Sequence, residues 1–533
     1  MAVFEKLFSL RRGAPSGRHR PKWRAVASVL ALGLPLLAVA PEPVSPVPPP
    51  GLGLLETIQL TLEHDPNISI ARSQLQSSRG ALLVAAGPFD PRLTSKLTQA
   101  STNTPLSTST SDPQRTTEGD LGFTKQFRSG LSIEPQLQLL RTEDPALSPE
   151  AVNTATVAFT FRQPLLRGKG KAATAAQELA AEREVAAAGL DLAHATAQRL
   201  VAVADQYWSF KAAAENLDIL RESERSSREL WQTTRRLVDA DQTPAAELVQ
   251  LEANLAAKEA SRIGGETALF KARQDLGREI GLDAAEIAAL PLPAEPFPTV
   301  PPGDLPPPEA AGRFVGQALA RRADLQAARE RLAESEIVVR AADNALQPQL
   351  DLVLTPSYSG LANGSGAGPF FSPLYHYVPG GSVALGFELA WPILRSKERG
   401  ALEQSRAARQ INGLRVDLTA KEIGADVPTA FDTVTRSARQ LARSSDAVRL
   451  FESTVLNEEK KLRAGTSTLL NVITQRDRLT AARQGEVSAQ LNLALALVEL
   501  RFATGTLLAV EGETPAVRRD RLTTVPSPTE ATP

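Results

Sequence analysis

Near the end of the chain, two long helical runs are joined by the stretch KLRAGTSTLL, residues 461–470. We expect the first helix to end near Arg463 and the second to begin near Thr468. Gly465 can adopt the left-handed conformation that terminates a helix, and one of the three hydroxyl residues that follow can cap the next helix. The stretch therefore predicts the tip of a helical hairpin.

A second tip lies earlier in the chain. Asp241, in the stretch LVDADQTP (237–244), precedes Gly465 by 224 residues (465 minus 241). The same offset relates two sets of residues that step by seven, which is the spacing of a left-handed coiled coil. The sets are Leu248, Leu255, Arg262, Leu269 and Leu276, and then Val472, Leu479, Glu486, Leu493 and Leu500. The chain is thus predicted to be a tandem repeat of a long helical hairpin.

Composition excludes several classes of function. The 533 residues include 59 basic and 60 acidic side chains, so the net charge of −1 indicates no nucleic-acid partner. The chain has no cysteine. Disulfides, thiolate metal sites, a cysteine nucleophile and a lipid-anchored amino-terminal cysteine are therefore excluded.

Residues 1–40 resemble a secretory signal, with a basic start, an apolar core at 25–39 and a small-residue cleavage site at 38–40. The apolar core is too short to cross a bilayer comfortably, because crossing takes about 20 residues. A proline-rich leader at 41–53 follows. We expect an exported protein.

Each repeat is expected to begin with a helix. The first spans about 54–87, with a break at 64–67, and its counterpart spans 311–346. Each helix ends at a proline that opens an extended segment. The long helix at 172–238 would measure about 100 Å, at 1.5 Å per residue. Its return helix at 243–281 and the first helix of the repeat could stack end to end along it.

The extended segments alternate between apolar and polar residues, which predicts strands with one apolar face. In the second repeat that face carries Val383, Leu385, Phe387, Leu389 and Trp391. A soluble sandwich would show the same alternation, but the signal sequence and the terminal aromatic favour lipid contact. Residues 100–118 are expected to be a loop and 128–130 the turn of an extra hairpin. A loop rich in glycine and aromatic residues follows in the second repeat (Phe370, Phe371, Tyr375, Tyr377). Each chain would then have four to six strands.

These elements define the predicted organisation. The fold class is mainly α with β. The first repeat is 54–290, a proline-rich linker is 291–309, the second repeat is 310–510 and a disordered tail is 511–533.

The sequence contains no catalytic motif, and we expect no enzyme, cofactor or metal site. The four histidines are scattered, without metal-ligand spacing. The stretch GKGK at 168–171 lacks the upstream glycine and the Ser/Thr of a phosphate loop, so it indicates a basic helix start.

Several motifs together resemble the TolC-type outer-membrane efflux protein family. They are the strand-to-helix connections QPLLRG (163–168) and WPILR (391–395), the turn RAGTSTLLNV (463–472), and DLQAA (324–328). The likeness covers about 52–506. It implies a homotrimer in the outer membrane, with a shared β-barrel and a helical tunnel through the periplasm. It also implies a periplasmic adaptor and, through it, an inner-membrane pump.

The resemblance assigns expected roles to two regions. The hairpin tips would contact the adaptor through Ala240, Asp241, Gln242, Thr243, Ala464, Gly465, Thr466 and Ser467. Family members often carry acidic residues after the second tip, but the matching positions here are the uncharged Asn471 and Thr474. Asp477, one turn further on, is a candidate for the entrance constriction or an ordinary surface charge. Export of drugs, metals or polypeptides is the implied function, and an exported periplasmic coiled-coil scaffold or adaptor is the alternative.

Overall fold

The computed structural model describes residues 51–527, apart from 108–109, 145–147, 149, 243, 302, 304, 376–379, 512–513 and 517–519. The expected signal sequence (1–40), nearly all of the leader, Thr243, Tyr377 and the last residues of the tail lie outside this part of the chain.

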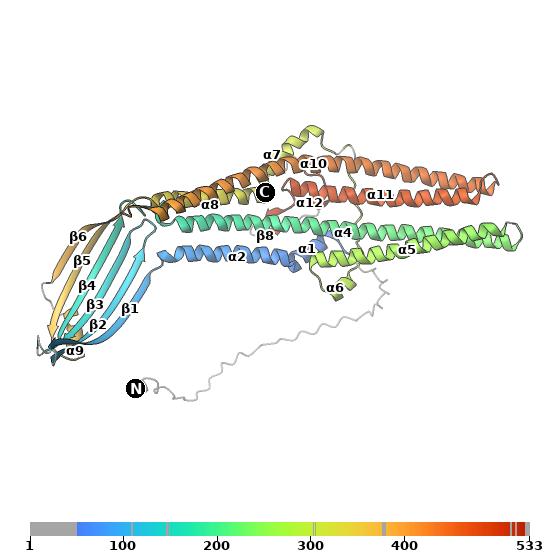
Figure 1. Cartoon of the computed structure of the whole chain (residues 1–533). Helices are drawn as coiled ribbons and strands as arrows, with labels where there is room; N and C mark the ends of the chain where they lie inside the picture. The colour runs from blue at the N-terminus through green and yellow to red at the C-terminus, as the bar shows by residue number, and fades with distance from the viewer. Residues whose placement is uncertain are drawn as a thin grey trace, which may run out of the picture. The chain divides into compact units, whose positions relative to one another are not determined.

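The order of elements repeats, as the sequence predicts. The first copy contains α1 (Leu54–His64), α2 (Pro66–Ala86), β1 (Arg92–Ser107), β2 (Thr110–Gln126), β3 (Ser132–Glu143), β4 (Val152–Pro164), α3 (Lys171–Thr174), α4 (Ala176–Asp239) and α5 (Ala245–Ile280). The second contains α7 (Ala311–Arg321), α8 (Ala323–Ala345), β5 (Gln349–Asn363), β6 (Gly381–Ala390), α10 (Ser396–Arg463) and α11 (Leu469–Ala503). In Figure 1 both helical hairpins extend away from the same sheet.

Short elements fill the connections. They are η1 (Gly87–Phe89), α6 (Ala284–Ala289), η3 (Pro308–Ala310), α9 (Ala367–Phe371), η4 (Ser372–Leu374), β7 (Ala509–Glu511), β8 (Thr514–Ala516) and α12 (Asp520–Thr523). The expected loop of the second repeat thus contains α9 and η4.

The strands form one antiparallel sheet in the order β1-β2-β3-β4-β5-β6. The predicted hairpin at 128–130 is confirmed, since it connects β2 to β3 and Gly130 has a φ of 99°. The expected loop at 100–118 is wrong, because most of it belongs to β1 and β2. Threonine favours strands through its branched Cβ. Because these hydroxyl residues do not alternate with apolar ones, the sequence pattern did not indicate strands here.

The predicted end-to-end stacking of short helices along a long one is confirmed. Asp65 separates α1 from α2 and caps α2, accepting from the backbone N–H of Asn67 at 2.6 Å. Arg199 of α4 contacts Asp65 at 2.6 Å and Glu279 of α5 at 2.9 Å. One side chain of the long helix therefore bridges the junction between the two shorter helices.

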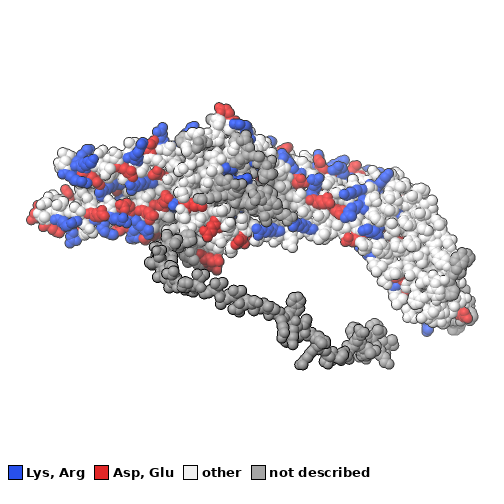
Figure 2. Space-filling model, turned by 180° about the vertical axis from the view of Figure 1, so that it is seen from behind, with Lys and Arg blue, Asp and Glu red and all other residues white. Residues whose placement is uncertain are grey.

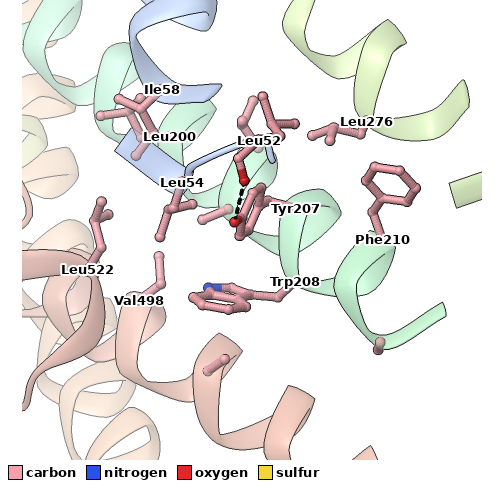
Figure 3. Packing of buried hydrophobic residues seen from close by; sticks show 14 of the residues in the cluster. Leu52, Leu54, Ile58, Leu200, Tyr207, Trp208, Phe210, Leu276, Val498 and Leu522 are labelled. Atoms are coloured by element: carbon pink, nitrogen blue, oxygen red, sulfur yellow. Dashed lines mark hydrogen bonds between the residues drawn. The ribbon is translucent and has the colours of Figure 1, made fainter. Parts of the chain in front are cut away.

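A hydrophobic cluster joins the two repeats beside this junction. Tyr207 and Trp208 of α4 are fully buried, and the Tyr207 hydroxyl donates to the Leu52 carbonyl at 2.9 Å. Figure 3 shows Val498 of α11 and Leu522 of α12 approaching the same cluster. Burying these side chains stabilises the contact between repeats, at about 1.5–3 kcal/mol for each large apolar residue.

The end of the chain differs from the expected disordered tail. Leu522 is fully buried, and buried Arg501 donates to the Thr524 carbonyl at 3.0 Å. Leu522 is a single apolar residue in a polar segment, so its place in the hydrophobic cluster is seen only from its tertiary contacts.

Candidate functional site

The apolar face of the sheet is exposed in the single chain. The side chains of Val383, Leu385, Phe387 and Leu389 on β6 are 65–73% exposed, and Trp391, just past β6, is 58% exposed. A soluble protein covers such a surface, whereas a membrane strand turns it to lipid.

The strand register extends this face across all six strands, including β1, β2 and β3, whose apolar residues the sequence did not reveal. Leu385 pairs with Leu354 of β5, and Phe161 of β4 pairs with both Leu354 and Ile133 of β3. On β1 and β2, Leu93 lies opposite Phe123 and Leu97 opposite Gly119. Leu93, Leu97, Leu121, Phe123, Phe159 and Leu354 are all exposed. Residues of one face alternate along each strand, so the pairing register determines which residues of neighbouring strands share the apolar face.

The opposite face is polar. Ser382, Ala384, Gly386 and Glu388 of β6 lie opposite Ser357, Thr355, Val353 and Asp351 of β5, in that order. Arg162 of β4 contacts Asp351 at 3.2 Å and also Glu388, so one ion-pair network spans three strands. A cavity of about 450 Å³ opens beside this network, where the strands lead into the helices.

The two hairpin tips share one backbone structure. Gly465 has a φ of 75° and Asp241 a φ of 55°. The Thr466 N–H donates to the Lys461 carbonyl at 2.9 Å, and the Gln242 N–H donates to the Leu237 carbonyl at 2.8 Å. Both helices therefore end in the same left-handed cap at the 224-residue offset. Ala240, Asp241, Gln242, Ala464, Gly465 and Thr466 are exposed, and Ser467 is half-buried.

The constriction candidates have separate surroundings. Asn471 is exposed and donates from its amide to Ser467 Oγ at 3.2 Å, while Thr474 Oγ1 donates to the Leu470 carbonyl at 2.9 Å. Asp477 instead faces the first hairpin, with its Oδ1 2.5 Å from Lys258 Nζ. A cavity of about 380 Å³ lies between the hairpins at this point.

Further along the helices, carboxyl groups from both repeats approach each other. Burial, with a smaller contribution from nearby Glu499, raises the pKa of Asp205 on α4 to about 6. Burial also raises the pKa of Glu499 on α11, helped by Asp426 and opposed by Arg322. Burial lowers the pKa of His194 on α4. Protonation is therefore coupled to packing between the repeats.

Within the described residues, no three His, Asp or Glu side chains are grouped closely enough to hold a metal ion. None of the helices in the described part combines the length and apolar character needed to cross a membrane.

Long paired hairpins on a sheet with an exposed apolar face define the class of outer-membrane channels with periplasmic helices. A family model described as "Outer membrane efflux protein" matches residues 314–506. Over these residues the chain matches the outer membrane efflux protein family, in agreement with the TolC-type resemblance of its sequence motifs, and the protein is located in the outer membrane, extending into the periplasm.

Two curated proteins are similar in sequence. The chain is 28% identical over 308 residues to the pyoverdine export outer membrane protein OpmQ of Pseudomonas putida, covering 57% of this chain and 61% of OpmQ. It is 23% identical over 494 residues to the alkaline protease secretion protein AprF of Pseudomonas aeruginosa, covering 89% and 90%.

Solved structures share the fold. The CmeC outer membrane channel of Campylobacter jejuni superimposes with a TM-score of 0.62 at 14% identity, over 85% of each chain. VceC of Vibrio cholerae gives 0.60 at 18% identity, over 85% of this chain and 96% of that one.

Proposed function

We propose that the protein is the outer-membrane exit duct of an export system, for small molecules or polypeptides. The observation that carries this proposal is the sheet, whose apolar face is exposed and whose two edges, β1 and β6, have no partner among the described strands. Backbone groups at such edges cannot remain unpaired in lipid, so the sheet has to close.

Closure is supplied by further copies of the same chain. β6 runs toward the helices and β1 runs away from them, so β6 of one copy can pair antiparallel with β1 of the next. Three sheets of six strands give an 18-stranded barrel, within the range of about 8 to 26 strands found in outer-membrane barrels. A homotrimer is therefore the proposed assembly, with the polar face lining the lumen.

The hairpin tips are proposed to contact a periplasmic adaptor, which connects the duct to an inner-membrane pump. Small exposed residues at Ala240 and Ala464 allow close approach of a partner's backbone. The proposed cargo includes both small molecules and polypeptides, because OpmQ is a pyoverdine export protein and AprF is a protease secretion protein.

Membrane fractionation tests the proposal. The protein should sediment with outer membranes and migrate as a trimer that dissociates on heating. A monomer in the soluble periplasmic fraction would instead support the scaffold alternative. Loss of export on deletion of the gene, restored by the wild-type chain, would then test the duct itself.

A further inference from the structure

The two strand-to-helix connections share a basic pattern that the exit-duct function leaves unexplained. Arg167, Lys169 and Lys171 follow β4, and Arg395, Lys397 and Arg399 follow β6. Each residue of the first set corresponds to one of the second at an offset of 228 residues (395 minus 167). Glu398 is the only acidic residue within 165–171 and 393–399.

The first cation of each set is half-buried. Arg395 donates to the Leu346 carbonyl at 3.0 Å and lies 5.5 Å from the centre of the Trp391 ring. Arg167 lines the cavity beside Arg162. The remaining four, Lys169, Lys171, Lys397 and Arg399, are exposed and take part in no salt bridge with the described residues.

Exposed apolar side chains immediately precede these cations. Ile393 is 90% exposed, Leu394 is 77% exposed and Leu166 is 39% exposed. They lie just beyond the ends of β4 and β6, next to the aromatic end of the sheet at Trp391. Figure 2 shows the sheet as a largely uncharged surface beside helices that carry both signs of charge. The four cations therefore stand at the boundary between an apolar surface and a charged one.

We propose that these four cations bind the phosphate groups of anionic phospholipids in the periplasmic leaflet of the outer membrane. We call the set of Lys169, Lys171, Lys397 and Arg399 the phosphate collar. The inference rests on the proposed insertion of the sheet into that membrane. Ile393, Leu394 and Leu166 enter the acyl region, and the basic side chains reach the headgroups above them. Such a collar adds an electrostatic anchor to a chain that has no cysteine for lipid attachment.

The repetition of the pattern supports lipid as the partner. Both connections lie at the same end of the sheet, so the two sets occupy one level beside the membrane. Three copies of the chain would carry twelve exposed cations around the barrel. A phospholipid leaflet surrounds a barrel on all sides and can satisfy every copy.

The test uses the purified full-length mature protein in neutral detergent, with dioleoyl phosphatidylglycerol as the anionic probe and dioleoyl phosphatidylcholine as the neutral one. The readout is the lipid concentration that gives half of the maximal rise in melting temperature. Phosphatidylglycerol should act at lower concentration, and higher salt should reduce its advantage. Each neutralised cation should raise the half-maximal concentration about fivefold for phosphatidylglycerol only.

The decisive variant is K169Q/K171Q/K397Q/R399Q. Its matched control, R235Q/R236Q/K460Q/R463Q, removes the same charge from exposed positions near the hairpin tips. The proposal is overturned if both lipids act equally on the wild type, or if the collar variant keeps the preference. A collar variant that retains the preference but loses export would point to an acidic protein partner. A wild-type chain absent from the outer membrane would contradict the exit-duct function itself.

Discussion

Lys258 Nζ of α5 lies 2.5 Å from Asp477 Oδ1 of α11, an ion pair that joins the first hairpin to the second close to their tips. From the sequence, Asp477 was either one member of an acidic ring or a surface charge between Arg476 and Arg478. The pairing with Lys258 is a third arrangement, in which the neighbouring hairpin neutralises the carboxylate.

The ion pair leads to a prediction about ion selectivity. D477N leaves the ammonium of Lys258 unpaired and should shift a reconstituted channel toward anions, whereas K258Q leaves the carboxylate unpaired and should shift it toward cations. The double variant should resemble the wild type. Reversal potentials in a salt gradient measure these shifts. Shifts of the same sign in both single variants would contradict the pairing. Stability should change by less than about 1 kcal/mol, because the aspartate is 43% exposed.

A second prediction concerns the apolar face of β6. F387R places a charge where the side chain is 68% exposed on the proposed lipid surface. It should cost about 2–4 kcal/mol and reduce the amount of trimer in outer membranes. A384R, on the opposite face of the same strand, is the matched control and should assemble better while altering conductance. Equal trimer yields for the two variants would argue against lipid contact at Phe387.

Gly465 tests the docking role of the second tip. A Cβ added at this residue would have open space around it, but the φ of 75° makes most side chains strained by about 1–2 kcal/mol. G465W should therefore leave trimers intact while blocking export through its bulk at the tip. G465N is the control, because asparagine is small and tolerates the left-handed conformation. Measuring both the amount of secreted cargo and the amount of heat-modifiable trimer distinguishes a docking role of Gly465 from a structural one. Loss of trimer in G465W would indicate a structural role alone.

The raised pKa of Asp205 predicts a dependence of stability on pH. Its folded-state pKa of about 6 lies above the ordinary value of 3.8, so the folded protein binds a proton more tightly than the unfolded chain. The stabilising contribution is fully present below about pH 4 and is lost as the pH rises through 6. Melting temperatures from pH 4 to pH 7 in detergent should fall more steeply for the wild type than for D205N. At pH 7 the variant should gain about 1 kcal/mol, after allowance for solvent screening.

Two outcomes would contradict this account of Asp205. One is parallel pH profiles for the wild type and D205N. The other is a stability that rises with pH over the same interval because of this residue. E499Q provides a second check, since the pKa of Glu499 is also raised by burial.

The sequence by itself determined the repeated helical architecture. Gly465 and the seven-residue spacing after it predicted both hairpins, because helix periodicity and left-handed caps are local properties. The break at Asp65 was also predicted, since a capping aspartate followed by a proline marks a helix start. The alternation along 383–391 likewise identified the four residues of the apolar face of β6, together with Trp391 just past it.

Only the tertiary structure decided the features that depend on distant residues. The hydroxyl-rich residues of β1 and β2 become strands through pairing across the sheet, and the register then places Leu97 and Phe123 on the apolar face. Lys258 and Asp477 are separated by more than two hundred residues, so no local pattern could pair them. Leu522 is buried because the hydrophobic cluster between the repeats accepts it. Periodicity is encoded along the chain, whereas the partner of a strand, a charge or a single apolar side chain is chosen by the packing of the whole fold.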